Sequence, residues 1–168
     1  MDASTLRDAQ APLKARYRED PSAALTPVSA RGDYRDGGVT ATVDGFAGPV
    51  RAGLHRATGG DGSDACSGDL LMEALLACAG VTLRAVATSM GVEIRSAELA
   101  ADGLFDARGT LGVSREAPVG VTGVRLTFTL DTDADDAALA RLATAIERYC
   151  VVGQSLATPP TVTVIRKG

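Results

Sequence analysis

The chain has 168 residues, of which 45% are apolar and 23% charged, a length and composition typical of one globular domain. A formal net charge of −4, singly scattered basic residues and only 4% aromatic residues exclude nucleic acid or an anionic membrane surface as the expected partner. The sequence has neither an uninterrupted apolar run of about 18–20 residues nor an apolar N-terminal region, so we expect a cytoplasmic protein.

The N-terminal part of the sequence predicts one helix, a connection and a β-hairpin. Residues 4–19 suit a short helix that Pro12 divides or forces to begin later, because proline cannot donate the helical hydrogen bond. Residues 21–38 are rich in proline, glycine and aspartate and predict a connection. Residues 38–45 and 49–57 alternate as strands do and would turn through Gly45–Gly48. Their expected apolar face consists of Val39, Ala41, Val43, Val50, Ala52 and Leu54.

A glycine-rich loop over residues 58–69 leads into the most apolar segment of the chain. Ser67 suits the N-cap of a helix there, and Asp69 in the first turn complements the helix dipole. From residue 70 to residue 90 the only charged residues are Glu73 and Arg84, so we expect a helix that is buried on most sides. Gly91 is a suitable C-cap.

The C-terminal part predicts strands around an amphipathic helix, which together with the preceding elements indicates an α+β fold. Residues 92–113 suggest two strand-like runs broken near residues 102–103, and residues 160–167 suggest a closing strand. Residues 123–131 alternate strongly, and residues 133–150 suit a helix capped by Asp135 or Asp136. The expected inward residues are Val124, Leu126, Phe128 and Leu130 on the strand, and Leu139, Leu142, Ala143, Ile146 and Cys150 on the helix.

Three cysteines in a reducing compartment indicate packing, catalytic or metal-binding roles rather than a disulfide framework. Cys66 and Cys78 would lie about 18 Å apart along a single helix, too far for a bond. Cys150 ends the apolar stripe of the later helix, and the helix of Cys78 is the obvious surface for that stripe. Cys78 and Cys150 therefore make a geometrically reasonable pair, while the alternative is that both are inert core residues.

Two motifs resemble the OsmC/Ohr family, which comprises osmotically inducible protein C and organic hydroperoxide resistance proteins. The segment "GDLLMEALLACAGVTLRAVA" is similar to the family's cysteine helix. The segment "ERYCVVGQSL" is similar to its second motif, with Val151 in place of the usual proline. The matching order of elements covers residues 38–166. The resemblance implies antiparallel sheets around two central helices in an intertwined homodimer, with an N-terminal segment over residues 1–37 and an OsmC-like domain over residues 38–168.

The resemblance also implies an activity, the reduction of organic hydroperoxides to alcohols by a thiol-dependent peroxidase. Cys78 would be the peroxidatic nucleophile and Cys150 the resolving thiol, which would form a disulfide with it. No cofactor is expected beyond an external dithiol that recycles the pair. An apolar wall of Leu71, Leu75, Leu76 and Val81 would favour an apolar hydroperoxide as the substrate.

The family activates its nucleophile with an arginine held by a glutamate. Arg56 is the first choice for that arginine, with Arg51 and Arg35 as alternatives. The position expected for the glutamate is Gly68, and either Asp69 or Glu73 would have to replace it.

Two further residues lack a family role. Cys66 is either an alternative resolving thiol that approaches the partner's site or a small buried residue. His55, the only histidine, is either a base or switch or an ordinary hydrogen-bonding residue.

Two other functions remain open from the sequence. A divergent, non-catalytic member would bind an apolar or thiol ligand at the dimer interface. A zinc site would need Cys66, Cys78, Cys150 and His55, although no Cys-x2-4-Cys spacing supports it.

Overall fold

The structure is a computed structural model that describes residues 2–168. It divides into two compact units. The first contains the chain up to Pro27, Leu75–Asp102 and Val124–Gly168, and the second contains Val28–Ala74 and Gly103–Gly123. The expected boundary between residues 37 and 38 stays a prediction. In chain order the elements are α1 (Ala3–Glu19), η1 (Pro21–Ala24), β1 (Arg31–Asp33), β2 (Thr40–Gly45), β3 (Gly48–Gly53), η2 (Arg56–Thr58), β4 (Ala65–Cys66), α2 (Ser67–Met90), β5 (Ser96–Leu104), α3 (Ala107–Thr110), β6 (Thr122–Asp131), α4 (Asp136–Tyr149), α5 (Val151–Gln154) and β7 (Thr161–Arg166). The α+β class is confirmed.

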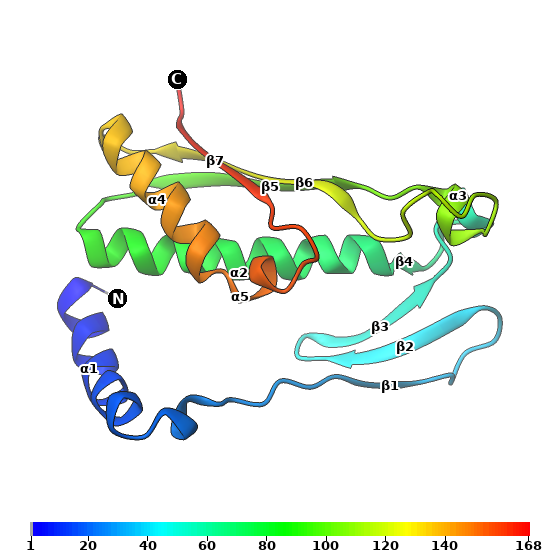
Figure 1. Cartoon of the computed structure of the whole chain (residues 1–168), viewed down its shortest axis with the longest axis horizontal. Helices are drawn as coiled ribbons and strands as arrows, with labels where there is room; N and C mark the ends of the chain where they lie inside the picture. The colour runs from blue at the N-terminus through cyan, green and yellow to red at the C-terminus, as the bar shows by residue number, and fades with distance from the viewer. Residues whose placement is uncertain (1) are drawn as a thin grey trace. The chain divides into compact units, whose positions relative to one another are not determined.

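The first unit is built on the sheet β5-β6-β7. β6 and β7 are parallel, with Phe128 opposite Val164, and α4 in their connection lies against β7 (Figure 1). Arg95 N donates to Asp131 O where β5 begins and β6 ends, so these two strands are antiparallel. The sheet is therefore mixed rather than antiparallel throughout, because the crossover through α4 returns β7 in the direction of β6.

The core of this unit matches the expected pattern. All four inward positions of β6 are buried, and Leu126, Phe128 and Leu130 have no exposed surface. On α4, Leu142 and Ile146 are also fully buried. The N-cap is Asp135, whose side chain accepts from Ala138 N at 2.7 Å. The strand and the amphipathic helix predicted from alternation and capping are thus confirmed.

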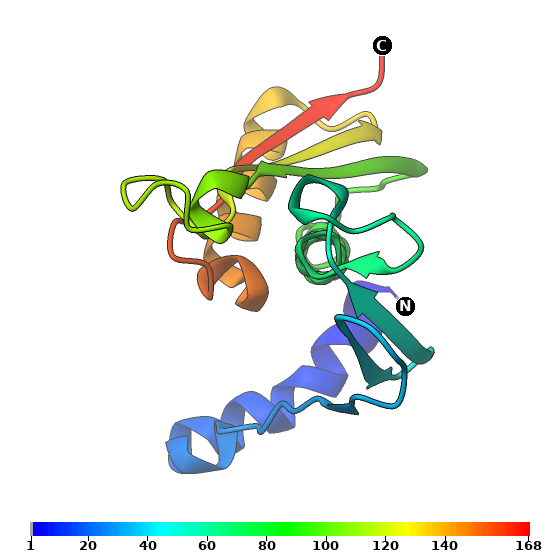
Figure 2. The same ribbon diagram turned by 90° about the vertical axis from the view of Figure 1, so that its right-hand side faces the viewer.

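The expectation that α2 is buried on most sides is wrong. Its buried residues form one stripe at every fourth position, Leu75, Ala79, Leu83 and Ala87. Val81 is 72% exposed. In Figure 2, which views α2 nearly end-on, the strands of the first unit lie along one side of the helix. One sheet covers one stripe of a helix, so in a single chain the other apolar residues of α2 are half-buried, as Leu76 and Val86 are, or exposed, as Val81 is.

The ends of α2 follow local rules. The helix begins at Ser67, one residue before the position expected from a Ser67 N-cap. It ends where Gly91 adopts a left-handed φ of 70° and Val92 N donates to Ala87 O, as the C-cap prediction requires. By length and composition alone α2 could also span a membrane, but the core helix of a globular protein passes the same test.

The second unit contains the sheet β1-β2-β3-β4. The predicted hairpin is confirmed, with Val43 opposite Val50 across β2 and β3, whereas β1 was not predicted. The expected apolar face is wrong, since Val39 and Leu54 at its ends are exposed and the buried residue of β2, Thr42, lies on the opposite face. The hydroxyl of Thr42 donates to the Asp36 carboxylate, which offsets the cost of burying it.

Two local predictions fail where tertiary pairing or solvent overrides a weak signal. α1 runs through Pro12 without a break, and none of its described residues is buried, so water can satisfy the carbonyl that proline leaves unpaired. β5 continues through the predicted break at residues 102–103, because pairing with β6 outweighs the low strand propensity of glycine. The second predicted run instead contains α3, whose N-cap is Asp106.

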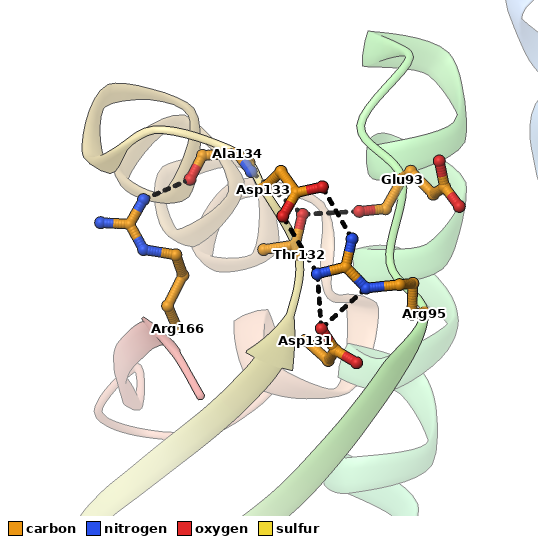
Figure 3. Close-up of polar contacts among 7 residues, drawn as sticks. All are labelled: Glu93, Arg95, Asp131, Thr132, Asp133, Ala134 and Arg166. Atoms are coloured by element: carbon orange, nitrogen blue, oxygen red, sulfur yellow. Dashed lines mark hydrogen bonds and ion pairs between the residues drawn. The ribbon is translucent and has the colours of Figure 1, made fainter. Parts of the chain in front are cut away.

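A polar cluster at one end of the β5-β6-β7 sheet connects this sheet to the segment that leads into α4 (Figure 3). Arg95 Nε donates to Asp131 at 2.8 Å, and its terminal nitrogens donate to Asp133 at 2.8 and 3.1 Å. The Thr132 hydroxyl donates to Glu93 O at 2.5 Å. The cluster therefore links the start of β5 to the segment between β6 and α4.

We expect this cluster to make stability depend on acid pH. The Arg95 guanidinium holds the pKa of Asp133 below its ordinary value. A depressed folded-state pKa contributes stability above the unfolded pKa of about 4 and loses it as the pH falls through the folded value. Asp133→Asn should therefore lower Tm at pH 6, and the difference from the natural chain should shrink towards pH 2. The exposed Asp102→Asn variant is the control, and a pH-independent difference for Asp133→Asn would contradict the assignment.

Candidate functional site

The first unit brings together the thiols of Cys78 and Cys150, both of which are free. Cys78 lies mid-way along α2, three positions after the buried Leu75, and is half-buried. Cys150 follows the last residue of α4 and is 1% exposed. The Cys78 thiol is a near enough neighbour of Cys150 to help raise the pKa of the Cys150 thiol. An incoming molecule can therefore reach Cys78 more readily than Cys150.

Cys150 occupies a junction between two helices. It is the C-cap of α4 and the N-cap of α5, and its sulfur accepts from Gly153 N at 3.3 Å. Burial raises the pKa of the Cys150 thiol, the Gly153 N–H opposes that rise, and the neighbouring Cys78 thiol adds to it. Cys150 is thus held as a protonated thiol at neutral pH.

Gly153 was not among the residues singled out from the sequence. A Cβ at this position would lie 3.4 Å from the Cys150 sulfur and 3.5 Å from Pro160, which is ordinary van der Waals contact, so Gly153 acts on the thiol through its backbone N–H. The Cys-x-x-Gly spacing at the start of a helix was the available signal. Val151 is exposed at the first position of α5, where a proline would lose no helical hydrogen bond, so replacing the usual proline leaves the turn intact.

The three candidate arginines all belong to the second unit, and they differ in their partners. Arg35 pairs with Asp33 at 2.6 Å and with Asp44 at 3.0 Å. Arg51 pairs with Asp64.

Arg56 forms no ion pair with any residue between 2 and 168. Its guanidinium lies against Gly62, where a Cβ would come within 2.3 Å of Nε. Among the three arginines, Arg56 is therefore the one that forms no ion pair with a carboxylate of the described residues.

The remaining candidates also lie in the second unit. Asp69 and Glu73 are exposed on the first turns of α2, and neither forms an ion pair within residues 2–168. Cys66 is half-buried where β4 meets α2, and His55 caps η2. The expected apolar wall is wrong as a single surface, because Leu75 belongs to the buried stripe of α2 and Val81 is exposed.

A metal centre finds no support in the geometry. Over residues 2–168, no three His, Cys, Asp or Glu side chains are grouped so that they could hold a metal ion.

Comparison with known proteins identifies the family. A family model described as OsmC-like protein matches residues 60–165, which is more than half of the chain and includes both cysteines. The chain belongs to the OsmC-like family. The resemblance of the two cysteine motifs is thereby confirmed, and no curated protein matches this OsmC-like chain.

Solved structures show the same fold at low sequence identity. An OsmC-like protein of unknown function from Vibrio cholerae has a TM-score of 0.68 at 13% identity, covering 84% of this chain and 100% of that chain. An organic hydroperoxide resistance protein from Elizabethkingia anophelis has a TM-score of 0.67 at 15% identity, with 86% and 99% covered. OhrB, the organic hydroperoxide resistance protein of Bacillus subtilis, has a TM-score of 0.54 at 18% identity, with 86% and 100% covered. The OsmC-like fold therefore extends beyond the matched segment.

Proposed function

We propose that this OsmC-like protein is a cytoplasmic, thiol-dependent peroxidase that reduces organic hydroperoxides to alcohols. The observation that carries the proposal is the placement of two free thiols side by side, one half-buried and one fully buried. The fold shared with organic hydroperoxide resistance proteins supports the same assignment.

The chemistry requires three balanced steps. The Cys78 thiolate attacks the distal oxygen of the hydroperoxide, the O–O bond breaks, and the alcohol leaves with a proton while Cys78 becomes a sulfenic acid. The Cys150 thiol then attacks that sulfur, and water leaves as the disulfide forms. An external dithiol reduces the disulfide by exchange and is itself oxidised to a disulfide. No cofactor enters any of these steps.

The assignment of the two roles follows from accessibility and protonation. Cys150 is buried and held as a thiol, which suits a group that waits for the sulfenic acid and reacts with it. Cys78 is the thiol of the pair with exposed surface, so it is the one that meets the peroxide.

We assign activation of the nucleophile to Arg56, the first choice from the sequence, because no carboxylate among residues 2–168 neutralises its charge, whereas Arg35 and Arg51 are paired with aspartates. The carboxylate that holds the arginine in the family has no counterpart at Arg56 within the described residues. A cation near the sulfur stabilises the thiolate and the charge that develops on the leaving oxygen. Arg56→Met should lower kcat/KM for cumene hydroperoxide by about 10- to 100-fold. Arg35→Met is the matched control, with an expected change of less than about twofold, and the reverse order of effects would assign activation to Arg35.

We also propose that the protein forms a homodimer. α2 and β5 border a mainly apolar groove lined by Val81, Leu83, Ile94 and Leu99, with Arg84 and Ser96 also in its wall, and Val81 is largely exposed. Burial of this face against a second copy would remove apolar surface from water. Sedimentation equilibrium should give twice the chain mass, and Val81→Glu should shift the equilibrium towards the single chain.

The decisive experiment treats fully reduced protein with one equivalent of cumene hydroperoxide and maps the products by intact mass and peptide linkage. The proposal expects the loss of two hydrogen atoms per chain and a Cys78–Cys150 bond. A bond through Cys66 would redraw the resolving step. Three free thiols with unconsumed peroxide would overturn the peroxidase assignment in favour of a ligand-binding protein.

A further inference from the structure

A cavity lies wholly within the second unit, among residues 53–121. Its volume is about 380 Å³, which falls in the range of small-molecule sites. Neither Cys78 nor Cys150 lines it, so it is separate from the thiol pair. Its lining includes Leu54, His55, Cys66, Phe105, Val119 and Val121.

The wall of this cavity favours an uncharged ligand. It contains no Asp, Glu, Lys or Arg side chain, and its larger side chains are aliphatic or aromatic. A charged molecule entering it would lose hydration without gaining an ion pair, which is costly. An apolar molecule instead gains by leaving water.

His55 supplies an oriented hydrogen-bond donor in this wall. Its Nδ1 accepts from Ala57 N at 3.0 Å, so in the neutral ring the proton is on Nε2. The ring packs edge-on against Phe105 with centroids 5.2 Å apart, which fixes its direction. Nε2 has no hydrogen-bond partner among residues 2–168 and is not buried without one, so it is open to solvent, and His55 itself lines the cavity. A ligand oxygen can therefore accept from it.

We propose that this cavity binds a small neutral carbonyl compound with an apolar body, whose oxygen accepts a hydrogen bond from His55 Nε2–H. A carbonyl oxygen only accepts hydrogen bonds, which matches a donor in an uncharged wall whose hydroxyl side chains are Thr58, Ser67 and Thr110, and it brings no charge. Cys66 lines the same cavity and is half-buried, so its thiol reports occupancy. This inference does not depend on the peroxidase reaction, because binding is measured without turnover.

The test uses the reduced full-length protein, with 2-octanone as the probe and octanoate as its charged counterpart. Saturating 2-octanone should slow alkylation of Cys66 by iodoacetamide at least about fivefold, while the rate at Cys78 stays unchanged. Calorimetry should show octanoate binding at least about tenfold more weakly. Equal affinity for the two probes, or an unprotected Cys66, would overturn the proposal.

Variants then locate the ligand. Val121→Phe reduces the cavity volume and should abolish protection of Cys66, and Val119→Phe at the rim serves the same purpose if Val121→Phe does not fold. A folded filling variant that binds 2-octanone with unchanged affinity would overturn the assignment to this cavity.

The role of His55 is tested separately. His55→Phe removes the donor and should weaken binding about fivefold or more. His55→Asn restores an acceptor for Ala57 N without the ring and should bind as weakly as His55→Phe. If His55→Asn bound 2-octanone as tightly as the natural chain, the weaker binding of His55→Phe would come from loss of the η2 cap. That result would overturn the proposed hydrogen bond from Nε2 to the ligand.

Discussion

Cys78→Ser is expected to abolish the turnover of organic hydroperoxides, lowering kcat/KM by more than about a thousandfold. A serine hydroxyl stays protonated at neutral pH and is a far weaker nucleophile towards peroxide oxygen than a thiolate. The half-buried position of Cys78 means that the substitution removes the group that the peroxide reaches first. Ala77→Ser, at an exposed neighbouring position of α2, is the control and should retain full activity.

Substitution of the second cysteine, Cys150, distinguishes the roles of the two thiols. Cys150→Ser should consume about one equivalent of peroxide per chain and then stop, because the sulfenic acid at Cys78 has no thiol to condense with. Excess peroxide should then add a second oxygen and give a sulfinic acid, visible by mass. Cys66→Ser tests whether the third thiol, Cys66, acts as the resolving group instead of Cys150. Steady turnover in Cys150→Ser, with loss of turnover in Cys66→Ser, would transfer the resolving role to Cys66.

Phe128→Ala is expected to have the largest effect on stability, lowering the free energy of unfolding by about 3–5 kcal/mol. Phe128 has no exposed surface and lies opposite Val164 in the β6–β7 register. Removing the ring deletes buried apolar contacts and leaves a cavity that the sheet can close only partly.

Arg125→Ala gives the matched control, since Arg125 lies on the same strand with its side chain on the exposed face. Arg125→Ala is expected to lower the free energy of unfolding by less than about 1 kcal/mol. Chemical denaturation at a fixed protomer concentration measures both variants, because dimer formation makes apparent stability depend on concentration. A cost below about 1 kcal/mol for Phe128→Ala would show that β6 is not the centre of the core.

Several elements were predictable because their signals are local. The inward residues of β6 alternate with a period of two, and the cap and stripe of α4 follow the helical period. Gly91 ends α2 because a left-handed residue is needed there. Family membership was also accessible, since both cysteine motifs lie in contiguous segments.

The failures came from interactions that a local pattern does not contain. An apolar helix predicts burial, but how much of α2 is covered depends on which surfaces reach it, and one sheet reaches one stripe. Asp44 and Asp64, which pair with Arg35 and Arg51, are 9 and 13 residues away along the chain, so only the fold shows these two ion pairs.

By itself, the sequence determined the α+β class, the OsmC-like family, and the positions of the main helices and strands. Those properties follow from periodicity, capping and contiguous motifs, which act over a few residues. Tertiary structure alone decided that β7 returns parallel to β6 and that Cys78, unlike the buried Cys150, is only half-buried. Each of these depends on packing between segments distant in the chain, and the same local pattern is compatible with more than one such packing.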